Sequence, residues 1–375
     1  MGLLVLNAGS SNLKASVFNC TDGKLLQSKP VWTKKIEWRE SDLKDCEEQI
    51  CSLLNDLPQN VEMVGHRIVH GGDKYFSSTL ITNEVIADLK ELIELAPLHE
   101  PISIIGIECA KRILGDVEQV AVFDTAFHST MPEASKIYAL PLEWYQKYKI
   151  HRFGFHGISH RYATLKAASI LQKSVEQMNL IVCHLGNGAS LCAVFNGKSV
   201  FTTMGYTPLD GIMMGTRCGS MDPGIILHLL KNKSLSVEQI ETALNEKSGL
   251  MGICGNSNMQ EVEQLVSKGD EKAILALEIY RQKLCSAIFS LLAYFEQLPD
   301  LVFTGGIGEN SSFLRQAVCE KLELIGYALN SDLNIKNQMD SILSSKQTSA
   351  KILVIQSKED LAIAEECVGI FSASS

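Results

Sequence analysis

The sequence predicts an α/β fold that is present twice in the chain. Short apolar runs typical of strands alternate with helical patterns along the whole length. Residues 9–19 read GSSNLKASVFN and residues 186–196 read GNGASLCAVFN, so the glycine and the Val-Phe-Asn ending align at a shift of 177 residues. Each copy has the pattern strand, polar glycine-rich turn, strand. Two such hairpins half a chain apart indicate a duplicated nucleotide-binding fold; a coincidence between two amphipathic hairpins is the alternative.

The predicted strands are apolar or β-branched runs that end in glycine or polar turns. They cover residues 3–6 and 13–18, a run opening at Gly23, and residues 64–69, 120–123, 180–184, 301–304 and 352–355. The predicted helices have apolar residues at helical spacing. They cover residues 42–54, 83–95, 160–173 and 271–296, of which the last is apolar on most sides and is expected to lie in the interior. We expect the division between domains soon after Asp124, within residues 126–150.

Length and composition bound the function classes. The 375 residues suit two domains, and 46% apolar with 21% charged residues exclude wholesale disorder. The formal net charge of -9 argues against a nucleic acid or an anionic membrane as partner. Eleven cysteines without a Cys-x-x-Cys pair indicate a reducing compartment. The amino terminus enters a strand pattern directly and the most apolar later stretch, 284–295, is too short to span a bilayer, so we expect a soluble cytoplasmic protein.

Three glycine-rich turns follow predicted strands, at residues 7–12 (NAGSSN), 185–190 (LGNGAS) and 305–310 (GGIGEN). Glycine lets backbone N–H groups approach phosphate oxygens, and small polar side chains add donors. None of the three matches the P-loop pattern. The third precedes a helical pattern, so a helix N-terminus is also available to an anion. One such turn alone is more commonly a plain hairpin or helix entry, whereas three after apolar strands favour a phosphate-binding cleft.

Two arginines lie among glycine and apolar neighbours: Arg67 in the string GHRIVHGG, and Arg217 at the end of GIMMGTR. A guanidinium group binds phosphate or carboxylate bidentately. An isolated arginine usually forms an exposed ion pair, but these surroundings favour an anion site. Asp124, at a strand end, is a candidate for positioning a metal or a water molecule. Glu359 lies at a strand-to-helix turn, where stabilising the helix dipole is the simpler role.

Nine histidines raise the question of zinc. His66 and His70, and likewise His156 and His160, have i,i+4 spacing, but the sequence has no His-Glu-x-x-His motif. We therefore expect no zinc site, and we expect the imidazole of His156 to donate to phosphate. Structural hydrogen bonding is the expectation for His66, His70, His128 and His160.

Eight strings in chain order resemble the acetate kinase family. They are VLNAGSSNLK (5–14), GHRIVHGG (65–72), LAPLHEP (95–101), FDTAFH (123–128), FGFHGISHR (153–161), HLGNGAS (184–190), MGYTPLDGIMMGTR (204–217) and FTGGIGENS (303–311). The resemblance covers nearly the whole chain. It implies a duplicated actin-like, ribonuclease H-like fold with a nucleotide cleft between two domains, residues 1–126, completed by a helix 360–375, and residues 127–359. It also implies a homodimer that uses ATP and Mg²⁺, with Mn²⁺ as the alternative metal, to convert acetate into acetyl phosphate and ADP.

The resemblance further implies roles for individual residues. The implied catalytic residues are Asp124, Arg67, Arg217 and His156, and the implied metal ligands are Asn7 and Glu359. The acyl substrate would be contacted by Arg67, Val69, Leu98, Phe155 and Pro208. The nucleotide would be contacted by Lys14, His184, Leu185, Gly186, Asn187, Gly188, Gly306, Ile307, Gly308, Glu309 and Asn310. The chain departs from the family pattern at Asn12, Phe201, Ser220, Asn258 and Gln260. These departures concern nucleotide preference and interdomain contacts more than the reaction class.

The implied chemistry suits these residue types. A simple carboxylic acid has a pKa near ~4–5 and is already ionised at neutral pH, so no general base is needed. The obstacle is the approach of one anion to another, and two arginines, an imidazole and a magnesium ion supply the positive field that this transfer requires in either direction. A propionate or butyrate kinase would share every phosphate motif. A non-catalytic actin-like nucleotide sensor would need neither Arg67, Arg217 nor His156.

Overall fold

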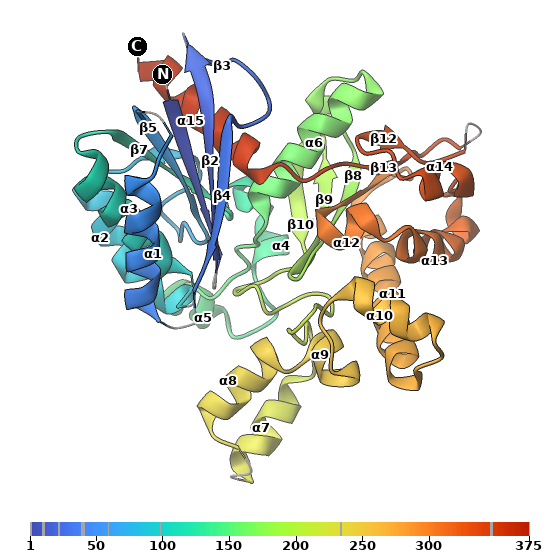
Figure 1. The fold of residues 1–375 in the computed structure, drawn as a ribbon. Coiled ribbons are helices and arrows are strands. Elements are labelled where there is room, and N and C mark those ends of the chain that lie inside the picture. Colours follow the sequence, from blue (N-terminus) through green and yellow to red (C-terminus); the bar gives the residue numbers. More distant parts are fainter. Residues whose placement is uncertain are drawn as a thin grey trace. The chain divides into compact units, whose positions relative to one another are not determined.

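The computed structural model describes residues 2–9, 12–21, 23–38, 42–58, 60–97, 99–232, 235–345 and 348–374. The chain forms two compact units (Figure 1). Unit 1 comprises residues 1–129, 156–162 and 358–375, and unit 2 comprises residues 130–155 and 163–357. Among the described residues, no helix is both long enough and apolar enough to cross a membrane.

A seven-stranded sheet forms the centre of unit 1. Its strands are β1 (Gly2–Ala8), β2 (Asn12–Thr21), β3 (Lys24–Leu25), β4 (Trp32–Glu37), β5 (Met63–Ile68), β6 (Thr79–Leu80) and β7 (Glu118–Phe123). The order is β3-β2-β1-β5-β7-β6, and β4 pairs with β2. The β1–β2 hairpin is antiparallel, β1–β5 and β5–β7 are parallel, and β6 is antiparallel to β7. The carboxyl ends of β1, β5 and β7 therefore lie at the same edge of the sheet.

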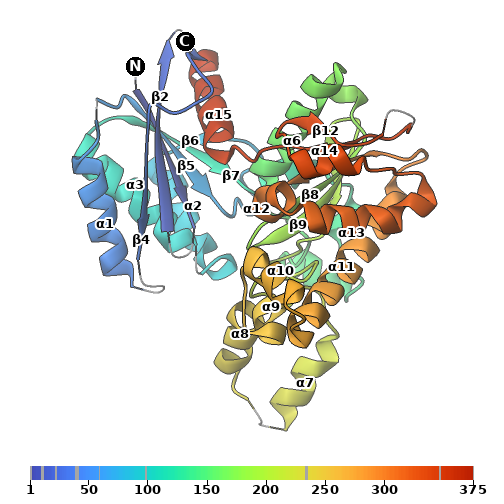
Figure 2. The same ribbon diagram turned by 45° about the vertical axis from the view of Figure 1, so that its right-hand side comes forward.

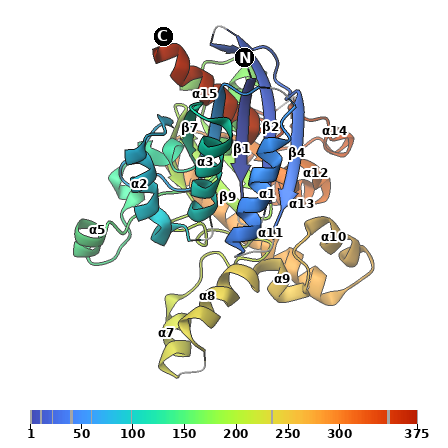
Figure 3. The same ribbon diagram turned by 60° about the vertical axis from the view of Figure 1, so that its left-hand side comes forward.

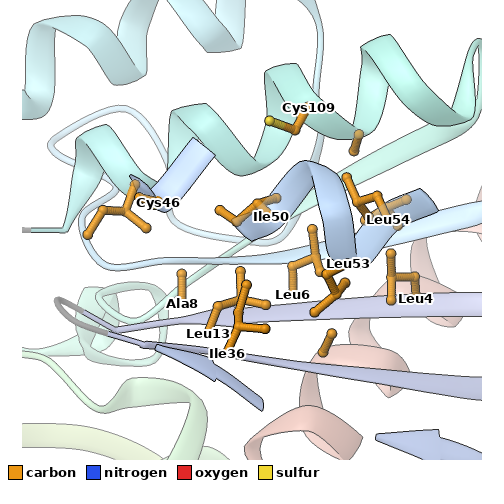
Figure 4. Packing of buried hydrophobic residues seen from close by; sticks show 14 of the residues in the cluster. Leu4, Leu6, Ala8, Leu13, Ile36, Cys46, Ile50, Leu53, Leu54 and Cys109 are labelled. Carbon is orange, nitrogen blue, oxygen red and sulfur yellow. The ribbon is translucent and has the colours of Figure 1, made fainter. Parts of the chain in front are cut away.

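Helices cover both faces of this sheet, because successive side chains of a strand point to opposite faces. Leu4 and Leu6 of β1 pack in one cluster with α1 (Leu43–Asn55) and α3 (Glu100–Leu114) (Figure 3, Figure 4). Helix α15 (Glu359–Ser374) contacts β1 and β5. A side chain would not fit at Gly65 of β5, because its Cβ atom would lie 2.5 Å from Sγ of Cys367 on α15.

The two helices predicted for the first part of the chain are confirmed. Helix α1 begins after Asp42, whose carboxylate accepts a hydrogen bond from the N–H group of Asp45 at 3.1 Å. The predicted helix 83–95 consists of α2 (Asn83–Glu91) and a 3₁₀ turn (Leu92–Leu95). A second 3₁₀ turn, Ala126–Thr130, follows β7.

A six-stranded sheet forms the centre of unit 2. Its strands are β8 (Leu180–Leu185), β9 (Ala189–Phe195), β10 (Lys198–Thr202), β11 (Asp300–Thr304), β12 (Ser341–Ile342) and β13 (Ile352–Val354). The order is β10-β9-β8-β11-β13-β12. The β8–β9 hairpin is antiparallel, β8–β11 and β11–β13 are parallel, and β12 is antiparallel to β13.

This pairing repeats that of unit 1, and the predicted duplication is confirmed. β8, β11, β13 and β12 take the places of β1, β5, β7 and β6, with the same parallel and antiparallel neighbours. The second strands of the two hairpins begin at Asn12 and Ala189, which are separated by the same 177 residues as the sequence echo. Hairpin strands β2 and β9 each take a further antiparallel partner, β4 and β10 respectively.

Unit 2 is rich in helices. They are α4 (Glu133–Lys136), α5 (Leu142–Tyr148), α6 (Gly157–Leu171, which begins in unit 1), α7 (Pro223–Lys231), α8 (Val237–Glu246), α9 (Gly249–Cys254), α10 (Met259–Ser267), α11 (Glu271–Leu291), α12 (Gly305–Asn310), α13 (Ser312–Leu322) and α14 (Ser331–Lys336), with 3₁₀ turns at Val175–Gln177, Leu292–Tyr294 and Glu323–Ile325.

Three sequence predictions are corrected by this structure. Helix α6 begins at Gly157, three residues before the predicted start at residue 160, and ends at Leu171 rather than at residue 173. The third glycine-rich segment is itself the short helix α12 and not a turn. Helix α11 is not interior: Ala276 and Leu284 are buried, but Ile274 and Leu275 are 46% and 54% exposed. Its apolar residues therefore extend beyond the face that packs against the unit.

A buried arginine that sequence analysis missed holds α12 in place. Arg315 of α13 is 0% exposed, and its NH1 group donates to the carbonyl oxygens of Gly308 and Glu309, both at 2.8 Å. Its Nε donates to Oδ1 of Asn334 at 2.8 Å and its NH2 to Oδ1 of Asn337 at 2.7 Å. Because a cation ties the carbonyl groups of α12 to α14, these helices form one packed group (Figure 2).

Candidate functional site

The charged residues of unit 1 gather where its parallel strands end. Asn7 lies near the carboxyl end of β1, Arg67 near that of β5, and Asp124 directly follows β7. Because β1, β5 and β7 are parallel neighbours in register, their ends lie side by side. This edge is where ligands bind in open α/β sheets.

An ion pair with the buried Asp124 fixes the orientation of Arg67, whose side chain is 16% exposed. Its Nε and NH2 groups donate to the same Oδ2 atom of Asp124, at 3.1 and 2.7 Å, and Asp124 is 1% exposed. Burial by itself would lower the pKa of Arg67, but the negative charges of Asp124, Glu359 and Asp360 raise it above its ordinary value. Burial raises the pKa of Asp124, and the Arg67 guanidinium opposes that change. Arg67 is therefore a permanent, oriented cation.

The first turn of α15 brings two more carboxylates to this cluster. Nδ2 of Asn7 donates to Oε2 of Glu359 at 3.1 Å and to Oδ1 of Asp360 at 3.0 Å. Oδ2 of Asp360 accepts from Oγ of Ser16 at 2.7 Å and pairs with Nζ of Lys14 at 2.7 Å. Lys14 and Asn7 thus contact the same carboxylate, although β1 and α15 lie at opposite ends of the chain.

The composition of this cluster suits a hard divalent cation. Asp124, Glu359 and Asp360 carry three negative charges against the two positive charges of Lys14 and Arg67. The acceptor atoms are carboxylate oxygens, which Mg²⁺ prefers, while the amide of Asn7 presents its Nδ2 group to them and its Oδ1 atom accepts from Arg67 at 3.4 Å. Mg²⁺ usually keeps several waters and binds one or two protein carboxylates together with substrate phosphates. The donor set near Asn7 and Glu359 therefore fits magnesium.

His156 is held close to Asp124 by the backbone. The N–H group of Gly157, the first residue of α6, donates to the carbonyl oxygen of Asp124 at 2.8 Å. A Cβ atom at Gly157 would collide with that oxygen, so only glycine fits there. His156 itself has a φ of 59°, a left-handed conformation that is uncommon for a residue with a side chain. Such backbone strain persists where the surrounding structure dictates it, often at functional sites.

The turn after β5 carries Val69, which is 3% exposed. The N–H group of the next residue, His70, donates to Oε1 of Glu100 at 2.7 Å. Glu100 begins α3 and is 0% exposed. The pKa of Glu100 is raised to about 8, and burial is the main cause. The hydrogen bond from His70 opposes this rise, and the negative charge of Asp124 adds to it. Glu100 was not among the residues predicted from the sequence. Leu98, which is predicted to contact the substrate, lies outside the described residues.

In unit 2, the second glycine-rich turn and Arg217 are linked through the backbone. His184 and Leu185 are buried at the end of β8, and the N–H group of Gly186 donates to the carbonyl oxygen of Gly188 at 2.9 Å. The carbonyl oxygen of Asn187 accepts from the N–H group of Gly215 at 3.1 Å, which joins this turn to the segment that ends at Arg217.

Arg217 also lies beside one residue of the predicted acyl pocket. Its NH1 group donates to the carbonyl oxygen of Pro208 at 3.1 Å. Phe155, from the same unit, is 1% exposed, and its neighbour Gly154 donates from its N–H group to the carbonyl oxygen of Gly205 at 3.2 Å. Unit 2 thus brings Arg217 and Pro208 together, and unit 1 brings Arg67 and Asp124 together.

The third glycine-rich segment lies next to the second. Gly305, at the start of α12, has a φ of 78°, and a Cβ atom there would lie 2.8 Å from the carbonyl oxygen of Leu185. Helix α12, which contains the predicted residues Gly306, Ile307, Gly308, Glu309 and Asn310, therefore begins against the end of β8. Oε1 of Glu309 accepts from the N–H group of Ser357 at 2.8 Å, so this side chain anchors the segment that leads to α15.

Two histidines have the structural roles expected of them. Nε2 of His66 donates to Oε1 of Gln119 at 2.7 Å, and burial lowers the pKa of His66 to about 4, so the ring is neutral at physiological pH. Nδ1 of His70 accepts from the N–H group of Gly72 at 2.9 Å. The rings of His128 and His160 stack edge to face, with centroids 5.5 Å apart.

The departures from the family pattern have local structural partners. Phe201 stacks with Tyr294 at 5.1 Å between centroids and lies under the guanidinium of Arg152. Oγ of Ser220 donates to Oδ1 of Asp210 at 2.6 Å. Asn258 caps α10, where its Oδ1 accepts from the N–H group of Gln260 at 2.9 Å, and Asn12 begins β2.

Comparison with known proteins gives a consistent result over the full length. Residues 2–365 match the family described as the acetokinase family. An acetate kinase of Trichormus variabilis is 41% identical over 400 residues, covering 98% of each chain. A solved propionate kinase of Francisella tularensis is 40% identical with a TM-score of 0.88, covering 97% of this chain and 98% of that one. A solved acetate kinase of Porphyromonas gingivalis is 34% identical with a TM-score of 0.87, covering 99% of each.

The raised pKa of Glu100 predicts a specific effect of pH on stability. In the unfolded chain Glu100 releases its proton near pH ~4.3, whereas in the folded protein its pKa is about 8. Between these two pH values the folded state therefore binds more protons than the unfolded state. The contribution of Glu100 to the free energy of unfolding is fully present below pH ~4.3 and is lost as the pH rises through about 8. Because an amide has no proton to lose, Glu100→Gln should raise the free energy of unfolding at pH ~8.5 by about 2 kcal/mol or more, and change it little near pH ~4.5.

Urea unfolding of both proteins at the two pH values measures this difference. The control is Glu108→Gln on the exposed side of the same helix, which makes the same substitution without removing a buried carboxyl group. An equal effect of Glu100→Gln at both pH values would show that the carboxyl group titrates normally.

Proposed function

Because this chain belongs to the acetokinase family, a family of kinases that phosphorylate a carboxylate acceptor with ATP, we propose acetate as its preferred acceptor. The products are acetyl phosphate and ADP, and the reverse reaction uses the same groups. The family match covers residues 2–365, so both units belong to the enzyme. A non-catalytic nucleotide sensor is not favoured, because it would not need the cation Arg67, oriented by its ion pair with Asp124.

The single observation that carries the residue assignment is the ion pair between Arg67 and Asp124. Acetate and the γ-phosphoryl group are both anions, so catalysis consists mainly of positioning and of stabilising the charge on the transferred group. Asp124 receives two hydrogen bonds from Arg67 on one oxygen, which fixes the plane of the guanidinium. We assign Arg67 to the acyl and phosphoryl oxygens and Asp124 to the positioning of Arg67.

The remaining catalytic groups are assigned from their backbone settings. His156, in its left-handed conformation beside Asp124, donates to the equatorial oxygens of the transferred phosphoryl group. Arg217, hydrogen-bonded to Pro208, acts on the same group from the segment that is joined to the Gly186–Gly188 turn. An in-line transfer needs no proton removal, because acetate is already ionised at neutral pH.

The metal is assigned to the charged cluster beside Asn7, and the nucleotide mainly to the two glycine-rich segments of unit 2. Asn7 and Glu359 would hold Mg²⁺, or alternatively Mn²⁺, which when bound neutralises charge on the phosphates of ATP. Lys14 lies beside the same carboxylates and would contact phosphate. Residues 184–188 would contact the phosphates, and Gly306–Asn310 would contact adenosine.

The acyl pocket is assigned to Val69, Leu98, Phe155 and Pro208. Val69 and Phe155 are almost fully buried, which suits a wall against a methyl group. None of the four is glycine or alanine, which would leave room for a long acyl chain. The structurally similar Francisella protein is named a propionate kinase, so propionate is the alternative preferred acceptor.

We further propose that the enzyme is a cytoplasmic homodimer and that residues 1–126 with 360–375, and residues 127–359, act as its two domains. Support for a dimer comes from α7 and α8, which carry exposed apolar side chains. Ile225, Leu227 and Val237 are 51%, 55% and 62% exposed, and α7 has no buried residue. Apolar side chains gathered on one element commonly mark an interface with another chain.

The arginine assignment predicts large losses of activity in variants that circular dichroism shows to be folded. Arg67→Ala and Arg217→Ala should each lower kcat/KM for acetate by about 10²–10³, because each removes one preorganised donor. Arg67→Lys should recover only part of this loss, since an ammonium group cannot reproduce the planar fork. Steady-state kinetics together with circular dichroism measure both properties.

The matched control for this experiment is Arg281→Ala, which removes an arginine paired with Glu278 on the surface of α11. Its kcat/KM should stay within about twofold of the wild type. Near-normal activity of a folded Arg67→Ala or Arg217→Ala protein contradicts the assignment of that residue.

The acyl-pocket assignment predicts a graded preference. Acetate should be the best substrate, propionate slower and butyrate poor, with steps of about 1–3 kcal/mol per methylene in transition-state binding. Val69→Ala should raise the ratio of propionate to acetate kcat/KM, because it enlarges the pocket. Trapping the acyl phosphate with hydroxylamine measures all three acids and also tests the proposed reaction.

The control is Val120→Ala, which opens a cavity at a fully buried position of β7 and should leave the ratio unchanged. A wild-type preference for propionate or butyrate would overturn acetate as the preferred acceptor but not the acyl kinase class.

The dimer proposal predicts a change of mass on substitution. The wild type should sediment at twice the mass of one chain, and Ile225→Asp combined with Leu227→Asp should sediment as a monomer, because charges at a buried interface lose their hydration. The control is Leu324→Asp, at a position that is 81% exposed on a different helical turn, which should remain a dimer. A monomeric wild type, or a dimeric double variant, contradicts the proposal.

A further inference from the structure

Two cysteines lie within reach of each other on the outer helices of unit 1. Cys51 belongs to α1 and Cys109 to α3, and their Sγ atoms are 3.0 Å apart. Figure 3 shows α1 and α3 side by side, and Figure 4 shows Cys109 on α3 beside the core residues of α1. No residue of the proposed catalytic cluster takes part in this contact. The proximity of the two sulfur atoms, which come from different elements, brings together the reactants of a disulfide.

A cation contacts both sulfur atoms. The NH2 group of Arg112 is 2.8 Å from Sγ of Cys51 and 3.6 Å from Sγ of Cys109, and it also donates to Oε1 of Glu47 at 2.8 Å. A neighbouring guanidinium stabilises a thiolate and thereby promotes its attack on an oxidant. Glu47 holds the guanidinium in this position, so the group is oriented toward the sulfur atoms.

The two cysteines differ in access. Cys109 is 1% exposed, and burial raises its pKa to about 12, so it remains a protonated thiol at neutral pH. Cys51 is only partly buried, and Arg112 beside it is on the surface. An oxidant from solvent can therefore reach Cys51 first, while Cys109 is placed behind it as the second thiol.

Glu47, Cys51 and Cys109 would also be a candidate metal site, because their ligand atoms lie within 4.8 Å of one another. The position of Arg112 argues against a metal. Its NH2 group contacts the ligand atoms of Glu47 and Cys51, and its positive charge would repel a metal cation at the same place. Arg112 therefore occupies the place that a metal ion would need.

We propose that Cys51 and Cys109 are a reversible redox pair. Oxidation by hydrogen peroxide forms a disulfide between them, which joins α1 to α3. The Cys51 thiolate attacks one peroxide oxygen and breaks the O–O bond. The departing hydroxide takes up a proton to become water, and Cys51 is left as a sulfenic acid. The sulfur of Cys109 then attacks that of Cys51, the S–O bond breaks, and the hydroxyl leaves as water with the proton of Cys109.

The net reaction consumes two thiols and one hydrogen peroxide and yields one disulfide and two waters, with two electrons passing from sulfur to oxygen. A dithiol reductant reverses it by thiol–disulfide exchange. The disulfide closes the segment between residues 51 and 109, which contains α2 and the strands β5 and β6. Closing a loop restricts the unfolded chain, so oxidation should make unit 1 more resistant to unfolding.

The test is mass spectrometry of the full-length protein, reduced and then treated with a small excess of hydrogen peroxide before alkylation and digestion. A peptide linking Cys51 to Cys109 should appear, and dithiothreitol should remove it. Arg112→Gln should slow its formation about tenfold or more.

The Tm of the wild type should rise by on the order of 5 °C on oxidation. Cys51→Ser should abolish both changes, and Cys254→Ser, which removes another partly buried cysteine, should leave them intact.

Three results would overturn the proposal. The first is oxidation of Cys51 to the sulfinic acid without a linked peptide, and the second is formation of the linked peptide at an equal rate in Arg112→Gln. The third is stoichiometric zinc bound by the reduced wild type and lost in Cys51→Ser, which would identify a metal site. Because Cys51 is partly exposed, its serine variant is expected to fold even if Cys109→Ser does not.

Discussion

The ion pair between Arg67 and the buried carboxylate of Asp124 is the constraint around which unit 1 is organised. A carboxylate taken out of water requires a cation in contact with it, and Arg67 supplies that partner to Asp124 from the neighbouring strand β5. Removing one member of such a pair leaves an uncompensated buried charge, which typically costs about 3–5 kcal/mol. The pair forms only because β5 and β7 are parallel and in register, so that both strands deliver their last residues to one edge. Asn7 and the first turn of α15 then surround the pair with further acceptors.

The duplicated fold presents two different kinds of edge. In unit 1, charged side chains gather at the carboxyl ends of the parallel strands. In unit 2, the corresponding edge carries backbone: the turn after β8 and the start of α12, both rich in glycine. Side chains can supply full charges and metal ligands, whereas closely approaching N–H groups suit phosphate oxygens. The same strand arrangement therefore presents charged side chains at the edge of one sheet and glycine-rich backbone at the edge of the other.

Residues that act through others were the ones that sequence analysis missed. Arg315 supports α12 through its carbonyl groups, Glu100 supports the turn that carries Val69, and Asp360 holds Lys14. In the sequence Arg315 and Glu100 have the appearance of ordinary helical surface residues. Their importance comes from burial, and burial of a polar residue on a helix depends on what packs over it. Asp360 directly follows Glu359, which the sequence did indicate as a site residue, so its place in the first turn of the same helix was a signal that pointed to it.

The sequence by itself determined the α/β class, the repeat, most strands and the glycine-rich segments, because these depend on local spacing of apolar residues and on the conformational freedom of glycine. It did not reveal the edge strands β4, β6, β10 and β12, which are short or partly exposed and so have weak patterns. Only the tertiary structure decided that α15 packs on the first sheet. Asn7 and Glu359 are separated by 352 positions, and no local pattern encodes the hydrogen bond between them. It forms because burying the apolar face of the last helix against β1 and β5 brings its first turn to the edge where Arg67 already lies.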